Sequence, residues 1–171
     1  MIISQKLTNY SAYKDGTDFL GTTDITLPSI EAMTDTISGA GIAGEIDTPT
    51  IGHFGSMTVG LNWRTVDTPT IELLKQKAHS LDFRGNMQAY DPAKGETKDV
   101  GVKITVKAIP KKADLGKFAV ASTTDSSNEL EVTYIKIIID GKTVLEIDKY
   151  NFICVIDGED QLENVRKNLS I

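Results

Sequence analysis

Apolar and polar side chains alternate with a period of two along much of the chain. The pattern is clearest in residues 57–63, 100–106 and 129–134, where every second residue is apolar. Residues 81–84 begin a further segment of the same kind. A β-strand directs successive side chains to opposite faces, so each segment predicts a strand with one buried face and one face in water. The sequence therefore predicts a fold that is mainly antiparallel β.

Three Asp-Gly dipeptides mark predicted turns, at residues 15–16, 140–141 and 157–158. Asp-Gly suits a type I′ turn because both central residues of that turn need a positive φ. The middle dipeptide separates two apolar and polar segments, residues 129–139 and 144–148. Those two segments are therefore predicted to pair as a long β-hairpin.

One segment with helical spacing interrupts the strands. Thr68 is a suitable N-cap and Pro69 a suitable first helical residue. The predicted buried face and the basic C-terminal end are formed by Ile71, Leu74 and Ala78, and by Lys75, Lys77 and His79. A second short helix is predicted at the end of the chain from the spacing of Leu162, Val165 and Leu169. The fold is expected to hold one packed helix and one short terminal helix.

Two segments match no regular element. Residues 110–128 are rich in Lys, Asp, Ser and Thr, which predicts an exposed connection. Residues 38–55 contain five glycines and Pro49, and long irregular loops in compact domains are often functional. The apolar residues of this glycine loop are too scattered for a local core: Ile42, Ile46, Ile51 and Phe54. We expect the loop to be an extended interaction segment that becomes ordered on a neighbouring subunit.

Composition limits the classes of function. The 171 residues show no internal repeat and no linker, so residues 1–171 are expected to form a single domain. A net charge of −6 argues against a general nucleic-acid binder, which needs a basic face. The first residues lack a signal peptide, and no apolar stretch approaches the roughly 20 residues of a membrane span. We therefore expect no membrane anchor and a protein made and folded in a cytoplasm.

Candidate chemistry is sparse. Residues 39–44 read G-x-G-x-x-G, the pattern of a dinucleotide-binding turn, so a soluble binding module that holds a nucleotide there is the alternative function. That site needs a buried strand before the turn and a helix after it. Here Glu45 and Asp47 place negative charge where the phosphates would lie, and Pro49 interrupts a helix. A flexible glycine loop is the better interpretation.

The reactive side chains do not form a recognised constellation. His53 and His79 are too far apart for a metal-binding motif and have no Cys or carboxylate at ligand spacing. Cys154, the single cysteine, lies in an apolar run, which favours a buried core residue over a nucleophile. No catalytic motif is present. We expect no enzyme activity, no catalytic residue, no cofactor and no metal.

Specific short motifs nevertheless point to a family. They occur over the last thirty or so residues as Asp140-Gly141-Lys142, Glu146-Ile147-Asp148, Asp157-Gly158, Asp160-Gln161-Leu162, Arg166 and Asn168-Leu169. The N-terminal part adds Asp15-Gly16, Phe19-Leu20-Gly21 and Thr26-Leu27-Pro28. With these motifs the whole chain resembles the major tail tube protein of contractile-tailed phages and of R-type bacteriocins (tailocins).

The resemblance implies a fold and an assembly. The fold would be two packed antiparallel β-sheets, a sandwich or barrel, flanked by a helix. Hexameric rings would form a continuous inner β-barrel and stack into a tube inside a contractile sheath, with a baseplate and a tail terminator at the ends. The tube would conduct DNA without specific binding in a phage, or ions in a bacteriocin. The protein would then belong to a virion tail or a tailocin particle assembled in the bacterial cytoplasm.

The resemblance also suggests roles for two groups of residues. The glycine loop corresponds to a glycine-rich segment of the family, and its expected contacts with neighbouring subunits are made by Gly41, Ile42, Gly44, Ile46, Ile51 and Phe54. One polar strand face is a candidate for the lining of the lumen: Ser56, Thr58, Asn62 and Arg64. A lumen with no excess of basic groups is expected from the net charge of −6.

Overall fold

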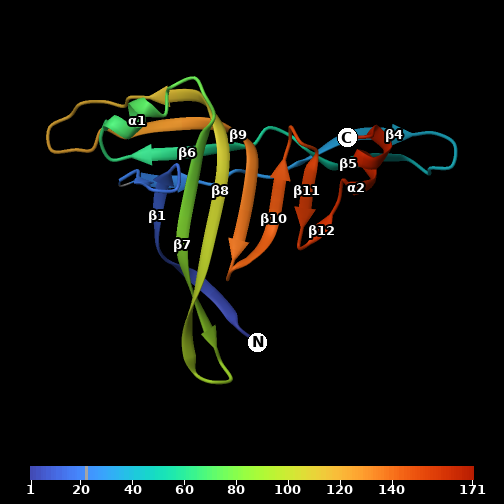
Figure 1. Ribbon diagram of the computed structural model, residues 1–171, viewed down its shortest axis with the longest axis horizontal. Helices are drawn as coiled ribbons and strands as arrows, with labels where there is room; N and C mark the ends of the chain where they lie inside the picture. Colours follow the sequence, from blue (N-terminus) through green and yellow to red (C-terminus); the bar gives the residue numbers. More distant parts are fainter. Residues whose placement is uncertain (22) are drawn as a thin grey trace.

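The fold of the protein is mainly β, as predicted, in a computed structural model that describes residues 1–21 and 23–171 (Figure 1). The strands are β1 (Ile3–Lys14), β2 (Asp18–Phe19), β3 (Thr23–Thr26), β4 (Ala32–Ser38), β5 (Glu45–Phe54), β6 (Thr58–Trp63), β7 (His79–Asp91), β8 (Glu96–Asp114), β9 (Ser126–Ile139), β10 (Lys142–Asp148), β11 (Ile153–Ile156) and β12 (Glu159–Asp160). The helices are α1 (Thr68–Glu72) and α2 (Glu163–Leu169).

Two antiparallel sheets of unequal size organise these strands. The larger sheet has ten strands, and its main path runs β12-β11-β10-β9-β8-β7-β1-β2. β8 follows one edge of β9, while β6 pairs with the first half of the other edge and β10 with the second half. Among the described strands, β4 and β5 pair only with each other and form a separate hairpin.

The large sheet folds over its own core. The pairing of β8 with β9 shifts register twice, between Lys107 and Ala108 and between Pro110 and Lys112, and such bulges bend a strand. In Figure 1, β9 bends in this region and β6 runs crosswise to β7 and β8. The apolar faces of these strands therefore face one another around one cluster of buried side chains.

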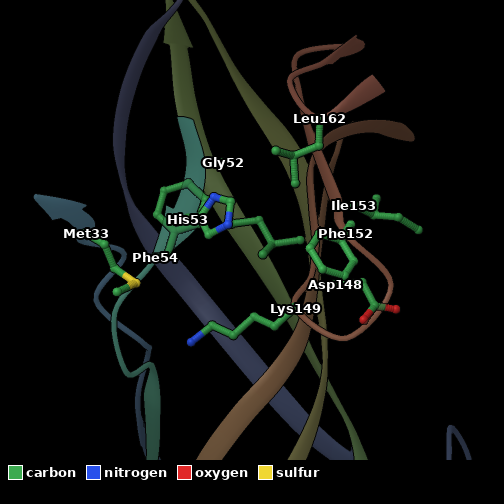
Figure 2. Close-up of a pocket in the computed structure, with 10 residues that line it drawn as sticks. Met33, Gly52, His53, Phe54, Asp148, Lys149, Phe152, Ile153 and Leu162 are labelled. Atoms are coloured by element: carbon green, nitrogen blue, oxygen red, sulfur yellow. The ribbon is translucent and has the colours of Figure 1, made fainter. Parts of the chain in front are cut away.

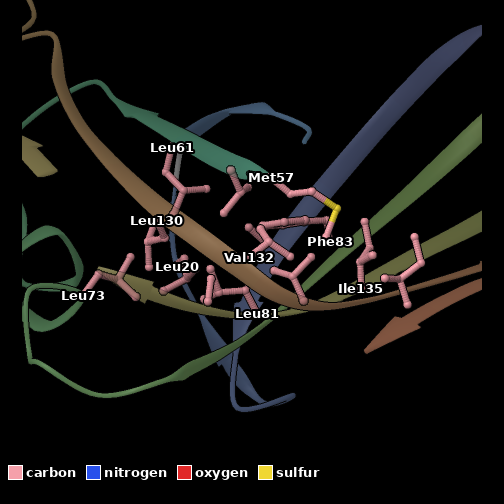
Figure 3. Close-up of a cluster of buried hydrophobic side chains, with 14 of the residues drawn as sticks. Leu20, Met57, Leu61, Leu73, Leu81, Phe83, Leu130, Val132 and Ile135 are labelled. Atoms are coloured by element: carbon pink, nitrogen blue, oxygen red, sulfur yellow. The ribbon is translucent and has the colours of Figure 1, made fainter. Parts of the chain in front are cut away.

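That cluster confirms the predicted alternation. Its fully buried members include Met57, Leu61, Leu81, Val106, Leu130 and Val132 (Figure 3). Burying one such side chain stabilises the fold by about 1.5–3 kcal/mol. The buried indole of Trp63 donates a 2.8 Å hydrogen bond to Asn128 Oδ1, and the Asn128 amide donates to the carbonyl of Thr70. These polar groups are buried with partners, which keeps their desolvation cost low.

All three predicted Asp-Gly turns are present. Both residues of each dipeptide have positive φ, between 48° and 83°. Asp140-Gly141 connects β9 to β10, and the predicted long hairpin is confirmed. The sequence therefore specified these turns locally, through residues that tolerate left-handed backbone angles.

The predicted first helix is wrong in its length and in its buried face. α1 ends at Glu72, and i→i+3 hydrogen bonds then close tight turns at Leu74 and Lys75. The buried residues are Thr70 and Leu73, whereas Ile71 is 49% exposed. Leu73 and Leu74 are adjacent, so helical spacing alone could place either of them on the buried face. Packing of α1 against β9 buries the face with Thr70 and Leu73.

Two more predictions around this helix need correction. His79 is the first residue of β7 and is buried, and its ring Nε2 donates to the carbonyl of Lys75 at 2.9 Å. It is therefore a core residue, not a helix-end residue. The predicted connection at 110–128 is shorter than expected, because β8 continues to Asp114 and β9 begins at Ser126.

The terminal helix α2 is confirmed. Leu162, just before it, is buried, and Val165 packs against the core, while Leu169 is exposed. Arg166 fixes the helix to the strands: it pairs with the carboxylate of Asp160 and donates a 2.8 Å hydrogen bond to the carbonyl of Phe152. The pKa of Asp160 is held below its ordinary value, chiefly by the hydrogen bond that its carboxylate accepts from Arg166.

Candidate assembly surfaces

The predicted glycine loop is a β-hairpin. β4 and β5 pair from Ala32↔Phe54 to Ser38↔Glu45, so the prediction that residues 38–55 match no regular element is wrong. The tip at 39–44 has three glycines with positive φ, between 93° and 136°. Both faces of the hairpin are largely solvent-exposed. Neither face had to be apolar, so the sequence shows no alternation of apolar and polar residues there. Figure 1 shows the hairpin projecting beyond α2 from the body of the molecule.

Five of the six predicted contact residues lie on the projecting part. Gly41, Ile42 and Gly44 are in the tip, and Ile46 and Ile51 are on β5, where Ile51 is 68% exposed. The sixth residue, Phe54, packs against the core of its own chain at the hairpin base. The sequence analysis did not single out Met33 and Ile37 on β4, which are also exposed and apolar.

The base of the hairpin is anchored to the body. Lys149 Nζ donates a 2.7 Å hydrogen bond to the carbonyl of Gly55, and the Gly55 amide donates to the carbonyl of Glu31 at 2.9 Å. Gly52, with φ +67°, approaches Leu162 so closely that a Cβ there would lie 2.4 Å from Leu162 Cδ2. Only glycine fits at this position without rearrangement. The hairpin base therefore packs directly against Leu162, the residue before α2.

A cavity of about 280 Å³ lies at this base (Figure 2). His53 and Phe54 line it from the hairpin, Phe152 from the turn after β10, and Ile153 from the start of β11. His53 Nδ1 donates to the carbonyl of Ile51 at 2.8 Å. The cavity therefore lies where the root of the hairpin meets the body of the molecule.

The nucleotide alternative has no structural support. Residues 39–44 connect β4 to β5, so a strand follows this turn where a dinucleotide site needs a helix whose amides face the pyrophosphate. Across residues 1–21 and 23–171, no group of three or more His, Cys, Asp or Glu side chains is placed to hold a metal. Cys154 is buried, and burial raises the pKa of its thiol, which disfavours the reactive thiolate. None of the described helices is long and apolar enough to cross a membrane.

The long strands of the large sheet have a polar face that points away from the core. On β7 this face consists of Ser80, Asp82, Arg84, Asn86, Gln88 and Tyr90. The register continues it across β8, β9 and β10 through Thr97, Asp99, Lys103, Thr105, Lys107, Tyr134, Lys136, Thr143, Glu146 and Asp148. We call this set the long polar face.

Charges of opposite sign are neighbours on the long polar face. Asp82 Oδ2 lies 3.6 Å from Arg84 Nη2 and 3.8 Å from Lys103 Nζ. Asn86 donates a 2.9 Å hydrogen bond to Asp99 across the same two strands. The interspersed signs make this face nearly neutral, in spite of the net charge of −6.

The pattern continues on β9 and β10. Lys107 Nζ lies 5.3 Å from the ring centroid of Tyr134, within cation–π range. Lys136 and Glu146 are opposite each other in register. Burial raises the pKa of Tyr134, and the nearby carboxylates of Glu146 and Asp148 raise it further. Tyr134 is thus a neutral phenol within this charged surface.

The four residues predicted for the lumen lie around β6, on another part of the solvent-facing side of the sheet. Ser56 Oγ donates to both carboxylate oxygens of Glu131, at 2.7 and 2.8 Å. Arg64 forms a 3.4 Å ion pair with Asp24. Thr58 and Asn62 line a shallow polar pocket between β6 and the start of β9. This group is polar, as predicted, but smaller than the long polar face.

The large sheet has open edges at both ends of its main path. β1 pairs with β7 along one edge, and along its other edge the described strands include only β2, at Tyr13 and Lys14. At the opposite end, β12 is two residues long and pairs with the end of β11. Open strand edges invite pairing with another chain.

A comparison with protein families finds a match over most of the chain. The family described as phage tail tube protein FII matches residues 4–169. The chain belongs to this family. The resemblance seen in the short motifs therefore extends over nearly the whole sequence.

Individual tail tube proteins match over similar lengths. The chain is 26% identical over 178 residues to the tail tube protein of Escherichia phage P2, with 100% of both chains covered. It is 25% identical over 166 residues to the major tail tube protein of Serratia phage KSP20, covering 93% of this chain and 91% of that one. The chain is thus a structural tube subunit.

A solved structure shows the same fold at low identity. It is the electron cryomicroscopy structure of an extracellular contractile injection system, the PVC sheath/tube terminator in the extended state. The TM-score is 0.54 at 11% identity, covering 77% of this chain and 94% of that one. The mainly β fold of this tail tube protein is therefore shared with a component of a contractile machine.

Proposed function

We propose that this tail tube protein forms hexameric rings that stack into the inner tube of a contractile tail. A sheath surrounds the tube, and a baseplate and a tail terminator close its ends. The subunits assemble in the bacterial cytoplasm into a virion tail or a tailocin particle. The observation that carries the proposal is the match of residues 4–169 to the tail tube family, together with unsatisfied assembly surfaces on this chain.

Ring closure follows from the open edges of the large sheet. The outer edge of β1 and the edge at β11 and β12 lie at opposite ends of the strand path. Pairing these two edges between neighbours is a heterologous contact, which generates a ring when the rotation closes. The ring would then hold one continuous β-barrel with no exposed edge.

The hairpin supplies a second contact. Ile46 and Ile51 are exposed on their own subunit. They would bury against the next copy together with Ile42 and the glycines of the tip. Phe54 takes a different role and anchors the hairpin base to its own core. The domain is thus one body, residues 1–171, with an interaction hairpin as its extension.

The long polar face is our choice for the bore. It spans the strands that lie between the two open edges, so ring closure would turn it toward a common axis. Its balanced charges would repel neither DNA nor ions strongly, and they offer no basic belt that would bind phosphates. The tube would therefore conduct DNA in a phage, or ions in a bacteriocin. The polar residues around β6 are the alternative lining.

Electron microscopy of the purified protein tests this function. We expect hollow cylinders of uniform diameter once the protein is concentrated, in the absence of nucleotide, metal or any other partner. Globular particles at all concentrations would contradict the proposal. Thermal stabilisation by a nucleotide would instead revive the binding-module alternative.

A further inference from the structure

The loop between β8 and β9 carries two apolar side chains fully in water. Phe118 is 92% exposed and Val120 is 101% exposed, which is unusual for large apolar residues. In Figure 1 this loop extends from the body beyond α1 and β6. We call Phe118 and Val120, with the loop at 115–125, the apolar knob.

The apolar knob is held at its base. The Lys117 amide donates to the carbonyl of Thr124 at 3.0 Å, and the Thr124 amide donates to the carbonyl of Arg64 at 2.9 Å. Gly116, with φ +76°, passes so close that a Cβ would lie 1.7 Å from Thr124 O. Ser126 Oγ closes the loop with a hydrogen bond to the carbonyl of Leu115. A base ordered in this way reduces the entropy lost when the knob binds a partner.

An apolar groove lies elsewhere on the same chain, among β1, β3, β7 and β8. Its volume is about 280 Å³, just below the range typical of small-molecule sites. The apolar groove is lined mainly by Leu7, Ile25, Leu27, Phe83, Met87, Val102 and Ile104. It continues the apolar side of the large sheet past the end of the core, where Leu7 and Leu27 remain about half exposed.

We propose that the apolar knob of one copy inserts into the apolar groove of a neighbouring copy. This inference rests on the proposed function, because a tube supplies a second copy at fixed geometry. The knob and the groove are different surfaces of one chain, so the contact between them is heterologous. A heterologous contact can repeat from one copy to the next.

The comparisons favour a second copy as the occupant, because tail tube proteins match this chain over nearly its whole length. The charged groups at the rim of the groove already have partners within the chain: Asp24 pairs with Arg64 at 3.4 Å and accepts a 3.2 Å hydrogen bond from Tyr10, and Arg84 pairs with Asp82. An apolar occupant therefore fits the groove best, as Phe118 and Val120 do.

Cysteine crosslinking tests the contact directly. In a Cys154→Ser background, one variant carries Ala119→Cys, which leaves Phe118 and Val120 intact, and a second carries Leu27→Cys at the groove rim. Tubes grown from an equal mixture and oxidised mildly should yield a disulfide-linked heterodimer. A matched mixture in which the exposed Tyr150→Cys replaces Leu27→Cys should yield several-fold less.

A second readout uses the concentration at which tubes appear. Phe118→Ser removes a fully exposed side chain, so the monomer should fold normally, and the critical concentration should rise about tenfold or more. Tyr150→Ser should change it less than twofold.

The outcomes separate this inference from the proposed function. Tubes without the heterodimer crosslink, or an unchanged critical concentration for Phe118→Ser, would overturn the knob-and-groove contact alone. Normal tubes from Phe118→Ser that no longer bind sheath would reassign the knob to the sheath and also overturn it. Absence of tubes from the parent protein would overturn both.

Discussion

Single residues at the hairpin root decide how the hairpin is held. Gly52→Ala should destabilise the fold by about 1–3 kcal/mol, because the new methyl group would overlap Leu162 and φ would remain positive. Gly41→Ala is the matched control: it has positive φ but no atom within 4 Å of the new Cβ. Thermal denaturation of both variants isolates the steric cost, and equal losses of Tm would show that Gly52 and Leu162 do not interact as described.

The ion pair that fixes α2 should depend on pH. Because Arg166 lowers the folded-state pKa of Asp160 below the ordinary 3.8, the pair stabilises the fold above that value and loses its effect as the pH falls through the lowered pKa. The Tm difference between the wild type and Asp160→Asn should therefore be largest near neutral pH and vanish in acid. Glu163→Gln, which breaks the exposed pair with Lys167, should change Tm little. A Tm difference that persists in acid would contradict this role.

At the scale of elements, the hairpin β4–β5 is the part we expect to control assembly. Replacing residues 36–47 with Asn-Gly would shorten it while keeping its base and its contact with Leu162. The variant should remain a folded, soluble monomer by circular dichroism and form no tubes. Ile46→Ser should raise the critical concentration for tube formation, whereas Thr34→Ser, on the opposite face of the hairpin, should not. Normal tubes from the shortened variant would remove the hairpin from the assembly interface.

The elements also show how far sequence reasoning reaches. Strands with one buried face, such as β6, were predictable because burial imposes a period of two on their side chains. The hairpin strands escaped because neither face is buried within the chain, so no alternation was required. The helix face at Thr70 and Leu73 was missed because tertiary packing, not spacing, chose between neighbouring leucines. Glycines and scattered isoleucines nevertheless marked the segment that projects from the body, and the contacts expected there stay a prediction.

At the scale of the whole molecule, the lining of the bore could not be predicted from the sequence. Polar faces occur on β6 and on β7 to β10 alike, and only the strand order shows which of them lies between the two open edges. The near neutrality of the long polar face arises in the same way, because residues such as Asp82 and Lys103 meet only after the strands pair.

An electron cryomicroscopy reconstruction of the assembled protein tests the central claim most directly. We predict a hollow tube of hexameric rings in which β1 of one subunit pairs with the β11 and β12 edge of its neighbour. Asp82, Arg84 and Glu146 should face the bore, with no continuous basic stripe along it. A tube lined by the polar residues of β6, or rings in which the outer edge of β1 stays unpaired, would contradict this account.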